Sequence, residues 1–265
     1  MHPLLNIGIR AARRAGDIII RNINRLDSIK VTSKGRNDFV SEVDRQAEAD
    51  IIETIRRSYP EHAFLAEESG RQGDSEFLWI IDPLDGTTNY LHGFPVFAVS
   101  IAVAHRDRLE HAVVYDPMRQ ELFTATRGVG AQLDGRKIRV SSQRNLESAL
   151  IGTGFPFRGK ETWLDSYMPM LKAVIASTAG VRRPGAASLD LAYVAAGRLD
   201  GFWELGLQPW DMAAGSLLVQ EAGGIVTSLS GNDDYVETGQ ILTGNSRIHD
   251  ALSAILTPLL PTESA

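Results

Sequence analysis

An apolar run, residues 77–81, leads into two aspartates that stand three residues apart, Asp82 and Asp85. The run predicts a buried strand, and the carboxyl ends of strands in α/β proteins are where ligand sites open. Pro83 fixes a backbone angle between the two aspartates, and Gly86 allows a sharp turn directly after them. Hard divalent cations take clustered oxygen ligands, and the amides and hydroxyls that follow can meet a phosphate or an attacking water. The segment therefore predicts a site for metal and phosphate.

Three other carboxylates suit the same purpose. Glu67 follows a short apolar run, residues 63–66, so it too lies at a strand end, and Asp211 follows a Pro-Trp pair and opens a helix. Asp44 stands in the first turn of another predicted helix. Each has an ordinary explanation, because a Glu-Glu-Ser triplet is typical of a solvated turn and an aspartate at a helix start is typical of a cap. Only their combination with residues 79–89 is specific.

Clustering such carboxylates is costly without a cation. Two like charges 4 Å apart repel by about 4 kcal/mol at an effective dielectric near 20. Divalent metals reverse that sign, and a pair of them can clamp the attacking and leaving oxygens of a phosphoryl transfer. Magnesium fits best, because it takes oxygen ligands and keeps waters that a substrate phosphate can replace.

Composition excludes several classes of protein. The 265 residues include 43% hydrophobic and 23% charged residues, a balance typical of a soluble globular chain with a substantial core. No cysteine is present, which excludes disulfides, zinc–thiolate sites and thiol catalysis and fits a cytoplasmic location. The net charge of −6 argues against direct DNA binding, and the absence of a long apolar run predicts no membrane span.

The apolar patterns predict helices and strands in two halves. Ser41 stands three residues before Asp44, as in a capping box, and Asp134-Gly135 marks a hairpin. The polar stretch 141–146 indicates a boundary between a first half, residues 1–145, and a second, residues 146–265. We expect helices over residues 4–19, 41–59, 163–178, 188–196 and 212–222 and from 246 onward. We expect strands over residues 63–66, 77–81, 96–104, 112–115, 121–125, 137–140, 149–153, 199–205, 225–229 and 241–243.

Three segments together resemble the signatures of the inositol monophosphatase family: residues 82–89, Glu67-Glu68-Ser69 and residues 210–215. The resemblance is close to the bacterial inositol-1-monophosphatases and spans nearly the whole chain, although Ala66 stands where many members have glycine. It implies an α/β (α+β) fold, the layered αβαβα sandwich of the inositol monophosphatase and fructose-1,6-bisphosphatase type. The first half would carry most metal ligands, and the second would carry the substrate pocket and one ligand.

The resemblance also implies a role for individual residues. The first Mg²⁺ would be held by Glu67, Asp82 and the backbone carbonyl of Leu84, and the second by Asp82, Asp85 and Asp211. Glu67 and Thr87 would orient and activate the attacking water, with Asp44 polarising Thr87. The phosphate would meet the amides of Gly86 and Thr87, the pocket would be lined by Gly185 and Ala187, Glu204 would bind substrate hydroxyls, and Lys34 would lie near the metals.

These residues predict a Mg²⁺-dependent phosphomonoesterase acting on myo-inositol-1-phosphate and related polyol phosphates, with two or three Mg²⁺ per subunit. By resemblance we expect a homodimer inhibited by lithium, with Arg182 and Arg183 ordering the pocket loop or pairing across the dimer. Relatives on the same scaffold hydrolyse fructose-1,6-bisphosphate, histidinol phosphate or 3′-phosphoadenosine phosphates, and these stay open as alternatives. A further alternative is a protein partner of RNA polymerase or Nus-type factors in transcription antitermination and ribosomal RNA synthesis. The six histidines show no metal spacing and are assigned no catalytic role.

Overall fold

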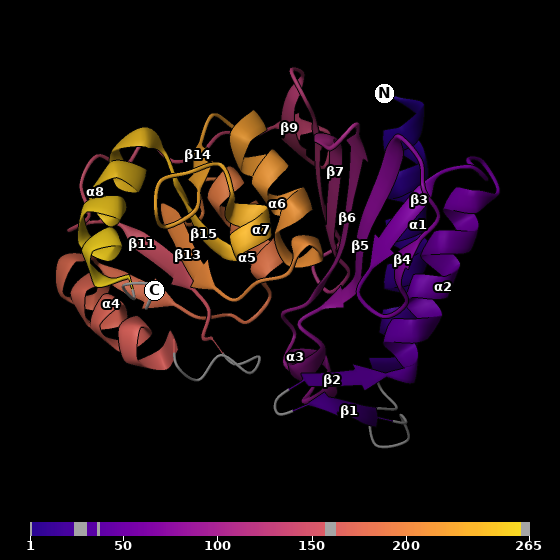
Figure 1. The fold of residues 1–265 in the computed structure, drawn as a ribbon, viewed down its shortest axis with the longest axis horizontal. Coiled ribbons are helices and arrows are strands. Elements are labelled where there is room, and N and C mark those ends of the chain that lie inside the picture. Colours follow the sequence, from indigo (N-terminus) through magenta and orange to yellow (C-terminus); the bar gives the residue numbers. More distant parts are fainter. Residues whose placement is uncertain (1, 24–30, 36–37, 157–162, 261–265) are drawn as a thin grey trace.

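Helices and sheets alternate in five layers. The computed structural model describes residues 2–23, 31–35, 38–156 and 163–260, with side chains described for all of these except 31–40. Helices α1 (Pro3–Asn22) and α2 (Glu42–Arg56) cover one face of an eight-stranded sheet (Figure 1). Helices α5 (Ala187–Ala195) and α6 (Pro209–Glu221) lie between this sheet and a five-stranded sheet. Helices α4 (Leu164–Ser177) and α8 (Ser246–Leu256) cover the remaining outer face, so the layer order is the predicted αβαβα.

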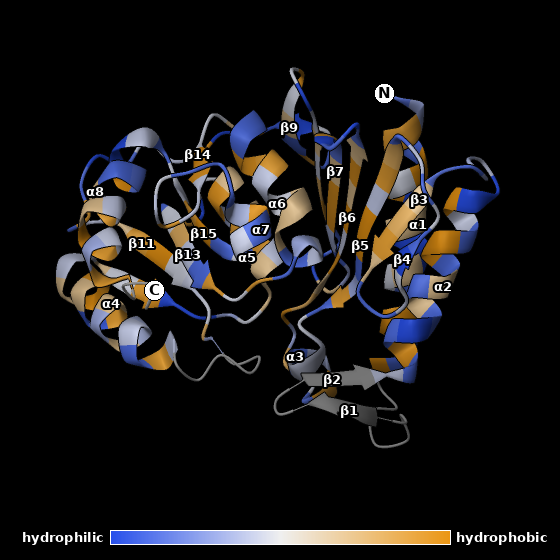
Figure 2. Cartoon of the chain, in the orientation of Figure 1, coloured by the Kyte–Doolittle hydropathy of each residue, from blue (hydrophilic) through white to orange (hydrophobic). Residues whose placement is uncertain are grey.

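The large sheet is mostly antiparallel, with β3 and β5 as its parallel pair. Its spatial order is β10 (Arg136–Lys137), β9 (Gly130–Leu133), β8 (Glu121–Thr126), β7 (Arg108–Asp116), β6 (Ala98–His105), β5 (Phe77–Asp85), β3 (Ala63–Ala66) and β4 (Gly70–Gln72). Trp79 and Ile81 of β5 pack beneath α1 and α2, whereas Ile80 packs against α5 and α6. Because helices cover both faces, β5 opens with five apolar residues in succession, Phe77 to Ile81, and its ribbon is largely orange in the hydropathy colouring (Figure 2).

The smaller sheet is mixed. Its order is β12 (Gly180–Arg182), β11 (Leu150–Thr153), β13 (Gly201–Leu205), β15 (Gln240–Gly244) and β14 (Ile225–Thr227). Strand β11 is parallel to both its neighbours, and β15 is antiparallel to both of its own. The central helices α5 and α6 touch closely because Gly215 has no side chain: a Cβ there would lie 2.5 Å from the Cβ of Leu191. Small residues thus let two helices fit between two sheets.

The remaining elements are short. They are β1 (Val31–Gly35), β2 (Asp38–Ser41), α3 (Thr87–Leu91), α7 (Tyr235–Thr238) and the 3₁₀ helix η3 (Thr257–Leu259). The predicted capping box is confirmed at the start of α2, where Ser41 and Asp44 bond each other's backbone N–H. Among the described residues, none of the helices has the length and hydropathy that a membrane span needs.

One predicted strand is wrong. Residues 137–140 were expected to form a strand, but β10 stops at Lys137, and the N–H of Val140 bonds the carbonyl of Ala222 at the end of α6 instead. The hairpin before it is confirmed, with φ of 48° at Asp134 and 77° at Gly135. Tertiary contact with α6 therefore overrides the local β pattern.

The large sheet draws its strands from residues 63–137 and the small sheet from residues 150–244. The division into catalytic halves at residue 145 stays a prediction.

A buried histidine should make folding sensitive to acid. His111 is 5% exposed, its Nδ1 lies 3.0 Å from the Thr126 hydroxyl, and its ring stacks on His2 at 4.4 Å. Burial, with the neighbouring His2, lowers the pKa of His111 from 6.5 to about 4. As pH falls, the unfolded state binds the proton before the folded state does. The free energy of unfolding is therefore highest above pH 6.5 and falls as pH approaches 4, by about 3 kcal/mol. Urea unfolding of His111→Gln should show a smaller loss of stability between pH 7 and pH 4 than wild type; an unchanged loss contradicts this assignment.

Candidate active site

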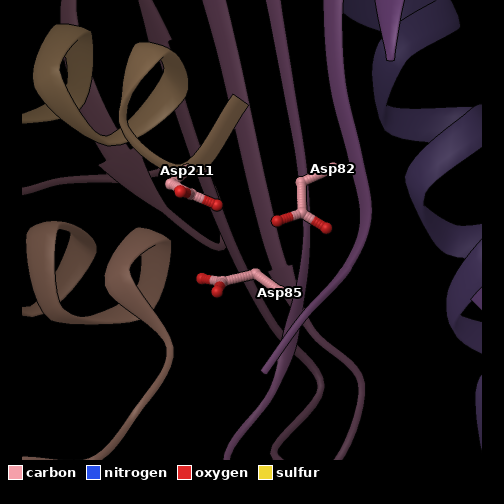
Figure 3. A group of neighbouring side chains, drawn as sticks. All are labelled: Asp82, Asp85 and Asp211. Carbon is pink, nitrogen blue, oxygen red and sulfur yellow. The ribbon is translucent and has the colours of Figure 1, made fainter. Parts of the chain in front are cut away.

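Three aspartates converge at the carboxyl end of β5. Asp82 and Asp85 lie on that strand, and Asp211 comes from the first turn of α6 (Figure 3). One carboxylate oxygen from each lies within 4.8 Å of the others. The Leu84 N–H donates to Asp82 Oδ1 at 2.9 Å, and the Gln208 N–H donates to Asp211 Oδ2 at 2.7 Å. These backbone bonds fix the carboxylates before any ligand arrives.

The cluster is electrostatically expensive as it stands. Exposed fractions are 1% for Asp82, 8% for Asp85 and 4% for Asp211. Burial first, and then the charges of Glu67, Asp85 and Asp211, raises the pKa of Asp82 well above its usual value. An all-oxygen set of this kind fits a hard divalent cation, whose charge would replace this mutual repulsion with attraction.

Glu67 and Leu84 complete the ligand set that the resemblance implies. Glu67 directly follows β3, and its N–H donates to the Ile81 carbonyl at 3.1 Å, which brings it beside the end of β5. The next residue, Glu68, donates its N–H to Glu48 Oε2 of α2 at 2.8 Å. The Leu84 carbonyl oxygen lies 3.1 Å from the Thr87 hydroxyl oxygen. Glu67 and Leu84 both line the cleft that holds the aspartates.

Thr87 is joined to a buried carboxylate. Its Oγ1 lies 2.8 Å from Asp44 Oδ1. Asp44 Oδ2 in turn accepts from the backbone N–H of Ser41 at 2.9 Å and from the Ser41 hydroxyl. Burial raises the pKa of Asp44, and the bonds from Ser41 and Thr87 oppose that rise. The helix cap of α2 thus holds Asp44 in place to receive the Thr87 hydroxyl.

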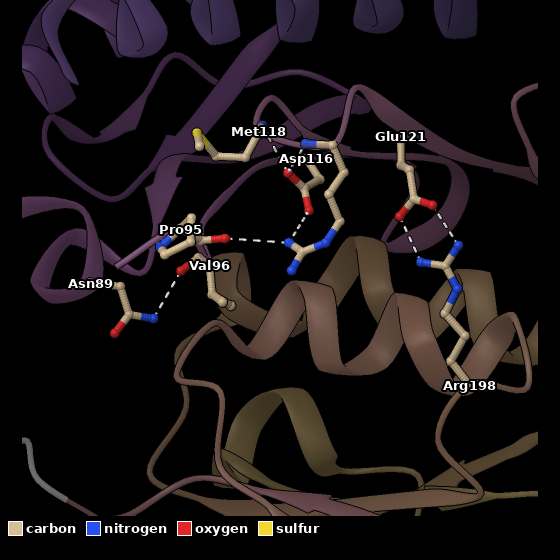
Figure 4. A network of polar contacts seen from close by, with 8 residues as sticks. Asn89, Pro95, Val96, Asp116, Met118, Glu121 and Arg198 are labelled. Carbon is tan, nitrogen blue, oxygen red and sulfur yellow. Dashed lines mark hydrogen bonds and ion pairs between the residues drawn. The ribbon is translucent and has the colours of Figure 1, made fainter. Parts of the chain in front are cut away.

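Gly86 turns the chain between the aspartates and Thr87. Its φ of 93° is a left-handed conformation, and a Cβ there would lie 2.9 Å from the Val96 carbonyl. The same carbonyl accepts from the Asn89 amide at 2.8 Å, as Figure 4 shows. Only glycine therefore fits between β5 and α3.

The second wall comes from the segment before α5. Asn89 Nδ2 also donates to the carbonyls of Pro184 at 2.9 Å and Gly185 at 3.3 Å, and Gly185 has a φ of 92°. The N–H and hydroxyl of Ser188 both donate to Asp85 Oδ2, at 2.7 and 2.5 Å. Further from the site, Glu121 pairs with Arg198 through two bonds and so links β8 to the end of α5 (Figure 4). Several bonds therefore hold the two walls together.

A cleft of about 370 Å³ runs between these walls. Besides the residues above, it is lined by Ala187, Glu204, Phe155 and Arg183. Glu204 lies on β13 directly over Gly154, where a Cβ would come within 2.2 Å of its carboxylate atoms. The Arg183 guanidinium lies 5.0 Å from the centre of the Phe155 ring, whereas Arg182 bonds the Val181 carbonyl at an exposed position. Lys34 lies in β1, and its side chain is outside the described residues.

The family model described as the inositol monophosphatase family matches residues 1–259 of the chain. This chain belongs to the inositol monophosphatase family. It is 56% identical over 266 residues to "Nus factor SuhB" of Pseudomonas aeruginosa, covering 98% of each chain. Among solved structures, it resembles the extragenic suppressor protein SuhB of Bartonella henselae with a TM-score of 0.94 and 45% identity, over 96% of this chain and 98% of that one. An inositol monophosphatase from Anabaena matches with a TM-score of 0.84 and 39% identity, over 99% and 98% of the two chains.

Four features of the site in this member of the inositol monophosphatase family are not predicted by the sequence patterns. They are the two donors of Ser188, the cross-link made by Asn89, the glycine beneath Glu204 and the Phe155–Arg183 pair. Ser188 and Asn89 each stand inside a predicted motif, yet nothing local in the sequence says what they contact. Within the described part of the chain, the three aspartates form the group suited to a metal, and no histidine belongs to it.

Proposed function

We propose that this protein is a Mg²⁺-dependent phosphomonoesterase that hydrolyses myo-inositol-1-phosphate and related polyol phosphates. The observation that carries the proposal is the convergence of three buried aspartates beside the Thr87–Asp44 pair. Membership of the inositol monophosphatase family supports the same chemistry. We further propose a cytoplasmic homodimer, with two or three Mg²⁺ in each subunit.

In this proposal some residues hold the Mg²⁺ ions and others orient the attacking water. Bound Mg²⁺ would lower the pKa of water and neutralise phosphate charge. Glu67, Asp82 and the Leu84 carbonyl would hold one ion, with Asp82 shared toward a second ion held by Asp85 and Asp211. The Thr87 hydroxyl donates its hydrogen bond to the Asp44 carboxylate. A lone pair of the hydroxyl oxygen would stay available to accept from the attacking water, which Glu67 would orient from the other side. The amides of Gly86 and Thr87 would donate to the phosphate.

The substrate's hydroxyls would meet the second wall. Glu204, Gly185 and Ala187 line the same cleft as the aspartates. One carboxylate can accept from two neighbouring hydroxyls, so Glu204 suits a polyol better than a simple alkyl phosphate.

Gly154→Ala should test this wall without touching the metal site. The new Cβ would fall 1.9 Å from Glu204 Oε1, and the end of that flexible side chain must move away. We expect KM for inositol-1-phosphate to rise about tenfold, as when one hydrogen-bonded contact is lost, with kcat changed much less. Steady-state kinetics measures both, and Glu204→Gln should reproduce the effect. Unchanged KM in both variants contradicts a substrate role for Glu204.

The proposed function itself is tested by phosphate release from inositol-1-phosphate, with Mg²⁺ and with EDTA. A panel containing fructose-1,6-bisphosphate, histidinol phosphate and 3′-phosphoadenosine 5′-phosphate distinguishes the alternative substrates. We expect Mg²⁺-dependent release, greatest from inositol-1-phosphate. Release from no member of the panel would refute the phosphatase proposal.

A second candidate function is suggested by the similarity to a protein named Nus factor SuhB. We propose that this chain also binds Nus-type factors or RNA polymerase, through a surface apart from the cleft. A pull-down with wild type and with Asp85→Asn tests it, since binding apart from the metal site should survive that change. Retention of partners by both proteins supports the proposal, and retention by neither refutes it.

A further inference from the structure

Helix α5 begins without a cap of its own. Its N-cap residue is Ala186, which has no side chain able to accept from the free N–H groups of the first turn. The Ser188 N–H instead donates to Asp85 Oδ2, which belongs to a different layer of the fold. A proposed metal ligand therefore also caps the positive end of α5.

The Ser188 hydroxyl strengthens this contact. It donates to the same oxygen at 2.5 Å, and the side chain is fully buried. Two donors on one carboxylate oxygen fix the rotation of the Asp85 side chain, in the way that donors behind a ligand orient it in known metal sites. Because Gly185 and Ala187 lie on the same short segment as Ser188, the placing of the substrate wall depends on this contact too.

We propose that Ser188 is a positioning residue for the metal site. Ser188 acts through Asp85, which it holds in the orientation that a cation needs. Through the same contact, binding of a cation at Asp85 is coupled to the position of α5 and of residues 185–187. The inference rests on the metal use proposed above, and it assigns the hydroxyl a purpose other than packing.

Calorimetry on the metal-free protein measures Mg²⁺ binding directly and so tests this assignment. Ser188→Ala should weaken Mg²⁺ affinity by about 10-fold or more, the range that loss of such a supporting partner usually costs. Ser188→Thr keeps the hydroxyl and should stay within about threefold of wild type. The matched control is Ser216→Ala, since Ser216 is also fully buried in a central helix but donates to the Ala213 carbonyl. Its Mg²⁺ affinity should match wild type even where its melting temperature falls.

The outcomes separate the two proposals. Equal Mg²⁺ affinity in wild type and Ser188→Ala overturns the positioning role, as does an equal weakening in Ser216→Ala or an absence of Mg²⁺ binding by wild type. Ser188-dependent Mg²⁺ binding in a protein that releases no phosphate supports the positioning role while refuting the proposed activity.

Discussion

Asp82→Asn should abolish Mg²⁺-dependent phosphate release while making the metal-free protein more stable. Asparagine keeps the shape of the side chain and can accept the Leu84 N–H, but it removes the charge proposed to bridge two cations. We expect kcat/KM to fall by about 10³-fold or more, equivalent to about 4 kcal/mol of lost transition-state stabilisation.

The gain in stability follows from the same cluster. Burial and the neighbouring carboxylates raise the pKa of Asp82 in the folded state. The folded state then binds the proton more tightly than the unfolded state, so the folding free energy becomes less favourable as pH rises above the ordinary aspartate value. In EDTA near pH 7 the variant avoids this cost, and each 1 kcal/mol gained should raise its melting temperature by about 2–4 °C.

Thermal melts with EDTA and with Mg²⁺ measure both effects together. Wild type should gain stability from Mg²⁺, by about 2.7 kcal/mol at a concentration 100 times the dissociation constant, and the variant should gain little. Asp116→Asn is a suitable control, because Asp116 is also fully buried but serves a turn, accepting from the N–H groups of Met118 and Arg119. Lower stability of Asp82→Asn in EDTA, or an undiminished response to Mg²⁺, would contradict the electrostatic account.

Sequence reasoning succeeded where the cause is local. Strand β5 follows from an unbroken apolar run, and the capping box at Ser41 follows from a hydroxyl and a carboxylate three residues apart. The strand predicted over residues 137–140 failed because the end of α6, more than 80 residues later, takes the Val140 N–H. Short elements such as β4, β12 and α7 have too few residues to show a period.

The candidate site could likewise be predicted only where its residues are neighbours in the sequence. The Asp82–Asp85 segment is visible locally, but its meeting with Asp211 depends on how α6 enters the space between two sheets. Only the resemblance to a family supplied that pairing in advance. The contact of Ser188 with Asp85 spans 103 residues and belongs to no recognisable spacing, so it appears only once the layers are assembled.

Thr87→Val should remove catalysis while leaving metal binding nearly intact. Valine matches threonine in shape but lacks the hydroxyl that donates to Asp44 at 2.8 Å. If that hydroxyl orients the attacking water, its loss should lower kcat by about 10²–10⁴-fold, the usual contribution of a positioned proton-transfer group. Mg²⁺ affinity should change little, because valine leaves all four carboxylates proposed as ligands in place and removes only the hydroxyl that lies 3.1 Å from the Leu84 carbonyl.

Asp44→Asn should lower kcat nearly as much as Thr87→Val does, because it changes the acceptor of the same hydrogen bond. The asparagine must turn either its carbonyl or its NH₂ toward Thr87, and Ser41 already donates two bonds to the other oxygen of Asp44. An NH₂ facing Thr87 would force the hydroxyl to accept rather than donate, which takes away the lone pair offered to water. Because the two residues form one unit, the double variant should be little worse than either single variant. Thr257→Val, which removes a hydroxyl bonded to the Leu229 carbonyl far from the cleft, should keep wild-type kcat. Additive losses in the double variant would show that Asp44 and Thr87 act separately, against the coupled arrangement drawn from their geometry.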